Sequence, residues 1–60
     1  MTTTREASDL IRGDTVILPG GLAQKVRDVV TCIATRETTI ILRDGTVLEH
    51  YSRDMVTVSA

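Results

Sequence analysis

Hydrophobic and polar positions alternate in short runs along this chain, and most of the runs have the spacing of strands. The longest run, residues 24–35, changes phase midway, because Val26 and Val29 would lie on opposite faces of a flat strand. We therefore expect it to bend or bulge near Arg27 and Asp28, or to be covered on both faces. Four shorter runs are rich in β-branched residues, namely 15–18, 38–43, 46–51 and 55–59. The pattern predicts five strands and almost no helix.

Glycine, proline and aspartate mark the connections between these runs. The sequence PGG at residues 19–21 predicts a loop, and a short loop is expected at residues 36–37. The sequence DG at residues 44–45 predicts a two-residue hairpin turn, since glycine adopts positive φ without cost. The polar residues 52–54 are expected to form one 3-10 turn before the last strand.

The N-terminal part has its own signals. Residues 1–7 are polar and aperiodic, so we expect a flexible tail, with the folded domain spanning residues 8–60. Ser8 or Asp9 is expected to cap a single helical turn. The letters RGD at residues 12–14 match an adhesion ligand. Because no secretion signal and no disulfide accompany them, we interpret them as the turn that begins the first strand.

Composition narrows the class of protein. Sixty residues form one domain with a thin core, and the 42% apolar content includes a single aromatic residue, Tyr51. Seven basic and eight acidic side chains give a formal net charge of −1, so there is no basic excess for a phosphate backbone. One cysteine, no apolar run of signal length and no transmembrane stretch lead us to expect an intact cytoplasmic protein without a membrane partner.

The order of the elements resembles an SH3-like β-barrel. The stretches "DLIRGDTVILPGG", "KVRDVV" and "IILRDGTVLEHYSRDMVTV" are similar to short proteins of unknown role from actinobacteria and their phages, over about residues 9–58. The resemblance implies an all-β, five-stranded SH3-like small barrel with a short 3-10 turn before its last strand. It also implies an accessory protein of a phage or mobile element, acting in the host cytoplasm. The shared motifs are turn chemistry, so they indicate a fold and no activity.

Two side chains are candidates for catalysis or metal binding. Cys32 lies inside a strand-like run and is expected to be a buried small hydrophobe. His50 is the only imidazole and is expected to be solvated. Together they fall short of the four ligands of a structural zinc, and a catalytic pair would need both residues on one face of neighbouring strands. We therefore expect no enzyme activity, no metal and no cofactor.

Surplus apolar residues are the positive signal for function. A small barrel has one interior, filled by about ten side chains, which leaves others for the exterior. We predict an interaction surface formed by Val30, Ile41, Leu48 and Tyr51, used with a protein partner or for homo-oligomerisation, together with edge strands. Alternatively, loops cover these side chains or they are singly scattered.

A second hypothesis is binding to nucleic acid. A KOW-type variant of the SH3-like barrel would use a basic patch on the second and third strands, here Lys25, Arg27, Arg36, Arg43 and Arg53. Acidic residues interleave with these positions, which is typical of a solvated mixed face. The lack of aromatic stacking platforms and the net charge argue against this alternative.

Overall fold

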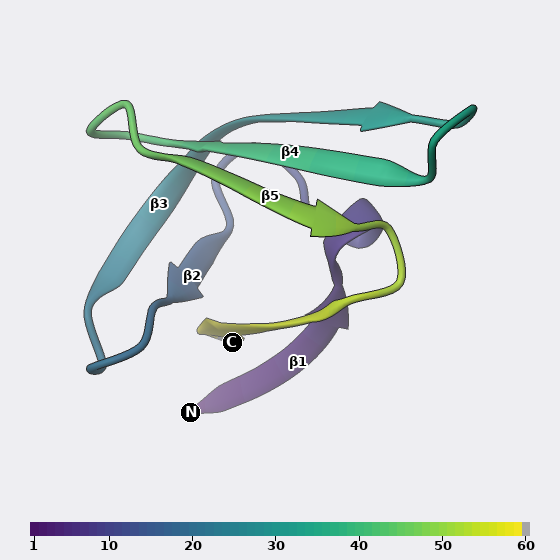
Figure 1. The fold of residues 1–60 in the computed structure, drawn as a ribbon. Helices are drawn as coiled ribbons and strands as arrows, with labels where there is room; N and C mark the ends of the chain where they lie inside the picture. Colours follow the sequence, from purple (N-terminus) through teal and green to yellow (C-terminus); the bar gives the residue numbers. More distant parts are fainter. Residues whose placement is uncertain (60) are drawn as a thin grey trace.

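Six antiparallel strands and one short 3-10 helix make up the computed structural model of the protein, which describes residues 1–59 (Figure 1). In chain order they are β1 (Thr2–Glu6), η1 (Ala7–Asp9), β2 (Thr15–Ile17), β3 (Ala23–Cys32), β4 (Glu37–Leu42), β5 (Val47–Tyr51) and β6 (Met55–Ser59). They form one sheet in the order β1-β6-β2-β3-β4-β5, so β1 and β5 are its edges. The all-β prediction is confirmed, but the sheet is open and has six strands in place of the predicted five.

β1 is the strand that the sequence pattern does not predict. In place of a flexible tail over residues 1–7, Thr2–Glu6 pair with β6 and Ala7 is fully buried. The side chains of β1 are almost all exposed, so no alternation of apolar and polar residues marks this strand. Backbone pairing with β6 holds β1 in place, and the folded unit begins there rather than at residue 8.

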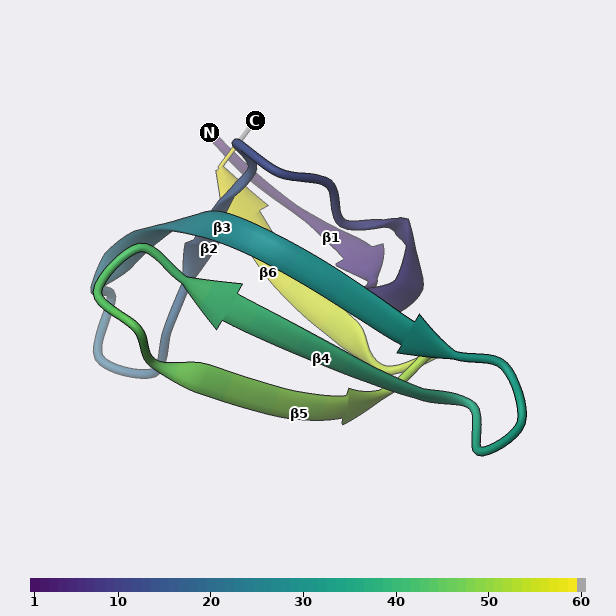
Figure 2. The ribbon, with the colours of Figure 1, turned by 90° about the horizontal axis from the view of Figure 1, so that it is seen from above.

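A sharp bend in β3 folds the sheet over on itself, as Figures 1 and 2 show. β3 pairs with β2 at its start and with β4 over the rest of its length, and the register shifts between Val26 and Asp28. Arg27 is the extra residue of this bulge, and consequently Val26 and Val29 both turn toward the core. The bend predicted near Arg27 and Asp28 is confirmed.

The core lies between the two halves of the bent sheet, β1–β6–β2 and β3–β4–β5 (Figure 1). Every buried side chain in it is aliphatic, which makes the packing dependent on a few branched residues: Ala7, Leu10, Val16, Val26, Ile40, Leu42, Val56 and Val58. Leu18, Val29 and Leu48 are partly buried against this cluster. None of the helices that residues 1–59 form is long and apolar enough to cross a membrane.

The connections mostly follow the glycine positions. Gly13 has a φ of +97°, and the Asp14 carboxylate accepts a hydrogen bond from the Ile11 amide at 3.0 Å, so the RGD sequence is a turn, as predicted. The hairpin between β4 and β5 also forms. Its loop has three residues rather than two, because the Leu42 amide donates to the carbonyl of Thr46 at 2.8 Å.

Contrary to the prediction, the described residues form no 3-10 turn between β5 and β6. Asp54 donates its amide to the Tyr51 carbonyl at 2.9 Å, which closes a single turn between β5 and β6. The 3-10 helix of the structure is η1, which precedes β2 and has no side-chain cap from Ser8 or Asp9. Leu10 then reaches the core, whereas Ile11 stays exposed.

Candidate interaction surface

The half-sheet β3–β4–β5 has one face on the core and one face toward solvent, and Figure 2 looks onto the solvent side. Residues that pair directly across antiparallel strands share a face, so the register assigns each side chain. The solvent side has three rows, which we call the outer face: Cys32–Glu37–Tyr51, Val30–Thr39–Glu49 and Asp28–Ile41–Val47. The opposite rows, which include Ile40 and Leu48, face the core.

Four apolar side chains give the outer face its character. Val30 is 55% exposed, Val47 52% and Tyr51 66%, and Ile41 on the middle strand β4 is partly exposed. Ile41 pairs directly with Val47 and is diagonal to Val30, so these three are neighbours. Tyr51 lies on the same face but two rows away, next to Glu37 and Glu49. Of the four residues chosen from the sequence, the structure places Val30, Ile41 and Tyr51 on this face.

Leu48 does not belong to the outer face, and Val47 takes its place. Leu48 pairs with Ile40 and packs against the core, whereas Val47 pairs with Ile41 on the solvent side. The alternation along β5 shows only that Val47 and Leu48 point in opposite directions. The pairing with β4 decides which of them is exposed, and the sequence of β5 alone does not predict that pairing.

The charged residues at the nine paired positions of the outer face are all acidic: Asp28, Glu37 and Glu49. Asp28 has a long ion pair with Arg12, with 4.0 Å between Oδ1 and Nη2, and both side chains are largely exposed. An exposed ion pair of this kind contributes little to stability. The outer face is therefore both apolar and acidic.

The five basic residues of the second hypothesis fall into two groups. Lys25, Arg27 and Arg43 lie at one end of the β3–β4 hairpin, where the Arg43 amide donates to the Lys25 carbonyl at 2.9 Å. Arg36 and Arg53 lie at the other end, where they line a hollow of about 380 Å³. None of the five makes an ion pair within residues 1–59. The structure does not assemble them into one patch.

Cys32 and His50 lie on opposite faces of the half-sheet. Cys32 pairs with Glu37 on the outer face, whereas His50 pairs with Thr38 on the inner one, so the two do not form a catalytic pair. The predicted burial of Cys32 is wrong, because the bulge shifts the alternation along β3 and places Cys32 on the same face as Val30. Hydrogen bonds from the Thr35 side chain, and then from the backbone of Thr35 and Ala34, lower the pKa of the Cys32 thiol.

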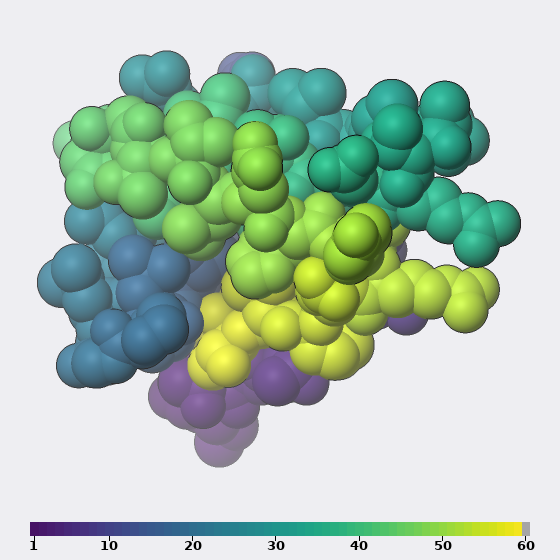
Figure 3. Space-filling model, viewed as in Figure 1, coloured from purple at the N-terminus to yellow at the C-terminus, as the bar shows by residue number. Residues whose placement is uncertain are grey.

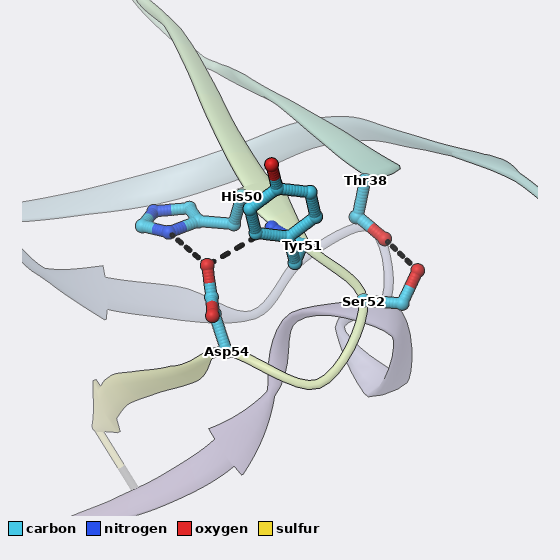
Figure 4. A network of polar contacts seen from close by, with 5 residues as sticks. All are labelled: Thr38, His50, Tyr51, Ser52 and Asp54. Carbon is cyan, nitrogen blue, oxygen red and sulfur yellow. Dashed lines mark hydrogen bonds and ion pairs between the residues drawn. The ribbon is translucent and has the colours of Figure 1, made fainter. Parts of the chain in front are cut away.

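A small polar network closes the end of β5 (Figure 4). The Tyr51 amide donates to Asp54 Oδ2 at 2.9 Å, and His50 Nδ1 lies 3.6 Å from the same oxygen. Beside it, the fully buried hydroxyl of Thr38 is 3.1 Å from Ser52 Oγ. No group of three His, Cys, Asp or Glu residues within the described chain is arranged to hold a metal ion. These contacts fix backbone and have a structural role.

An apolar groove lies between β5 and β6. Its volume is about 530 Å³, and it is lined by the end of β2 and parts of both strands: Ile17, Leu18, Pro19, Leu48, His50, Met55, Val56 and Thr57. Figure 3 views this side, with the green atoms of β5 above the yellow atoms of β6. The groove follows the free edge of β5, because no strand pairs with β5 beyond β4.

Comparisons of the chain with protein families, with curated proteins and with solved structures find no match. The outer face, the two basic groups and the groove are thus the features from which a function is inferred.

Proposed function

We propose that this protein is a non-enzymatic interaction module that binds a protein partner through its outer face. The observation that carries the proposal is the set of four apolar side chains, Val30, Ile41, Val47 and Tyr51, which share one face of three adjacent strands. Of these, Val30, Ile41 and Val47 are neighbours, and neighbouring exposed apolar side chains mark protein interaction sites more often than isolated ones do.

The charge of the outer face defines the chemistry of the partner. Asp28, Glu37 and Glu49 would be placed against a second set of carboxylates if two outer faces packed together, and like charges in contact oppose binding. A partner with Lys or Arg around an apolar centre is complementary. The outer face is therefore proposed to bind a basic, apolar surface of a different protein.

The alternative proposal is a KOW-type nucleic-acid barrel. The group Lys25, Arg27 and Arg43 favours it, because these three residues are close in the fold and free of ion pairs within residues 1–59. The acidic outer face beside them and the single aromatic residue disfavour it.

The finer fold class is also a proposal. Four features support an SH3-like plan for strands β2 to β6: a loop after the first strand, a bent second strand, hairpins in the middle and a tight turn before the last. β1 would then be an addition to that plan. A role as an accessory protein of a phage or mobile element, in the host cytoplasm, rests on the resemblance of the sequence alone.

The test is a selection from a library of displayed random peptides, followed by NMR titration of the labelled chain. We expect enriched peptides to combine Lys or Arg with apolar residues, and to shift the amide signals of Val30, Ile41 and Val47. The variant Ile41→Asp should lose this binding, and the control Thr4→Asp, on the exposed β1, should keep it. Enriched peptides without basic residues would contradict the proposal. An oligonucleotide titration in which only the signals of Lys25, Arg27 and Arg43 shift, with no peptide binding, would contradict it as well.

A further inference from the structure

We infer that two copies of this chain join edge to edge through β5, antiparallel about a two-fold axis at Leu48, so that their sheets become continuous. The inference goes beyond the proposed function, in which the outer face binds a different protein. It uses another surface, because the contact lies along the backbone edge of β5, and of the outer face only Val47 and Glu49 lie beside it.

The backbone of β5 shows which groups are available. The Leu42 amide donates to the carbonyl of Thr46, so Thr46 and, by alternation, Leu48 and His50 direct their backbone groups toward β4. Val47, Glu49 and Tyr51 direct theirs toward the free edge. At Tyr51 the amide donates to Asp54 Oδ2 and the carbonyl accepts the Asp54 amide.

Asp54 therefore closes one end of the edge. Within residues 1–59, the amides and carbonyls of Val47 and Glu49 remain as four unpaired groups in a row, since no strand of this part of the chain lies beyond β5 in the sheet. Unpaired edge groups of this kind are the usual template for adding a strand.

Only one symmetric register pairs these four groups with their copies and needs no others. A two-fold axis at Glu49 would oppose the two Glu49 carboxylates and would require Tyr51 to release Asp54. An axis at Val47 would pair Glu49 with Gly45, which lies in the turn at a φ of +92°. An axis at Leu48 pairs Val47 with Glu49 of the second copy twice, which makes four hydrogen bonds and separates the carboxylates.

The groove supplies the apolar contact for this register. Leu48 is only partly buried and lines the groove together with Leu18 and Met55. A strand added to β5 lies along the mouth of the groove (Figure 3), and its inward side chain at the two-fold axis is a second Leu48. In an antiparallel pair of this type the two leucines are close neighbours. Each copy thus covers the other's exposed apolar surface.

Charge complementarity also supports a second copy. Antiparallel pairing brings the β4–β5 turn of one copy next to the β5–β6 turn of the other. The first turn carries Arg43 and the exposed carboxylate of Asp44, and the second carries Arg53 and Asp54, so each turn offers one charge of each sign to the other. Neither Arg43 nor Arg53 has an ion pair within residues 1–59. The other free edge, β1, is different, because its side chains are threonines and charged residues.

The first experiment measures solution mass by sedimentation equilibrium over a series of chain concentrations. The wild type should approach twice 6.5 kDa as concentration rises. Glu49→Pro removes an amide that faces the edge and not β4, and proline is tolerated there. It should weaken association about tenfold or more, because each copy loses one hydrogen bond. The matched control is Thr4→Pro at the other edge, which should associate like the wild type.

Two further experiments test the register. Val47→Lys places a lysine opposite Glu49 of the second copy and should strengthen association about fivefold, whereas Val47→Glu should weaken it by a similar factor. In a Cys32→Ser background, Leu48→Cys should form an intermolecular disulfide on mild oxidation, because the two positions meet at the axis. Val47→Cys in the same background should not.

The outcomes separate this inference from the proposed function. A wild type whose mass stays at 6.5 kDa at every concentration overturns the dimer. So does a Glu49→Pro variant that associates like the wild type and has the circular dichroism spectrum of the folded chain. Weakening by both Val47→Lys and Val47→Glu overturns the register. Ile41→Asp, which tests the outer face, should leave the mass unchanged, so either proposal can fail alone.

Discussion

At the scale of single residues, Arg27 has the largest effect on where the other side chains point. It is the extra residue of the β3 bulge, so Val26 faces the core while Val30, four positions later, faces solvent. Without the bulge the two residues would share a face. The acidic, apolar outer face and the exposed Cys32 therefore both depend on this one irregularity.

The thiol of Cys32 provides a prediction at this scale. Hydrogen bonds from Thr35 lower its pKa below the usual value of 9.0, which raises the fraction of thiolate at neutral pH. Thr35→Val removes the largest of these bonds and should slow alkylation by iodoacetamide at pH 7. Thr35→Ser retains the hydroxyl and is the matched control, with a rate close to the wild type. Equal rates for Thr35→Val and the wild type would contradict the assignment.

The same shift affects stability as a function of pH. The folded pKa of Cys32 lies below the unfolded value, so ionisation of the thiol stabilises the folded chain above the unfolded pKa. This contribution is lost as the pH falls through the lowered pKa. A Cys32→Ser variant should consequently lose stability relative to the wild type mainly at alkaline pH, as followed by urea unfolding.

At the scale of elements, local sequence signals are sufficient to predict every strand except β1. The run at residues 55–59 coincides with β6, and the phase change at Val26 and Val29 marks the bend of β3. β1 was not predicted because its side chains are exposed, and only its distant partner β6 makes it a strand. Leu48 was misplaced for a related reason: register with β4, and not alternation along β5, determines its face.

β1 offers the prediction for this scale. Deleting residues 1–6 removes the backbone pairing with β6 and uncovers the edge beside Val56 and Val58, which are buried in the complete chain. We expect a loss of about 1–3 kcal/mol in the free energy of unfolding, since several hydrogen bonds of about 1 kcal/mol each are lost against a gain in chain entropy. Urea denaturation measures it.

The control for this deletion keeps the backbone and changes only side chains. Thr2→Ala combined with Thr4→Ala alters two exposed residues of β1 and should leave the unfolding free energy within about 0.5 kcal/mol of the wild type. A deletion as stable as the wild type would mean that residues 1–6 do not contribute to the fold.

At the scale of the whole molecule, the margin of stability is small. A chain of 60 residues is expected to have about 3–9 kcal/mol of unfolding free energy, and its core is a single aliphatic cluster. One core side chain is thus a large share of the total. Two adjacent isoleucines of β4 lie on opposite faces, Ile40 on the core and Ile41 on the outer face. Substituting each of them in turn tests both the fold and the proposed function.

Ile40 is fully buried, so Ile40→Ala should cost about 2–5 kcal/mol and leave much of the population unfolded at 37 °C. Ile41→Ala removes the same atoms from the solvent side and should cost about 1 kcal/mol or less. Urea denaturation of both variants gives the comparison. Ile41→Ala, still folded, should also bind basic apolar peptides less well than the wild type, which a mere loss of stability would not explain. Similar losses of stability in the two variants would contradict the assignment of the faces, and with it the outer face as a binding surface.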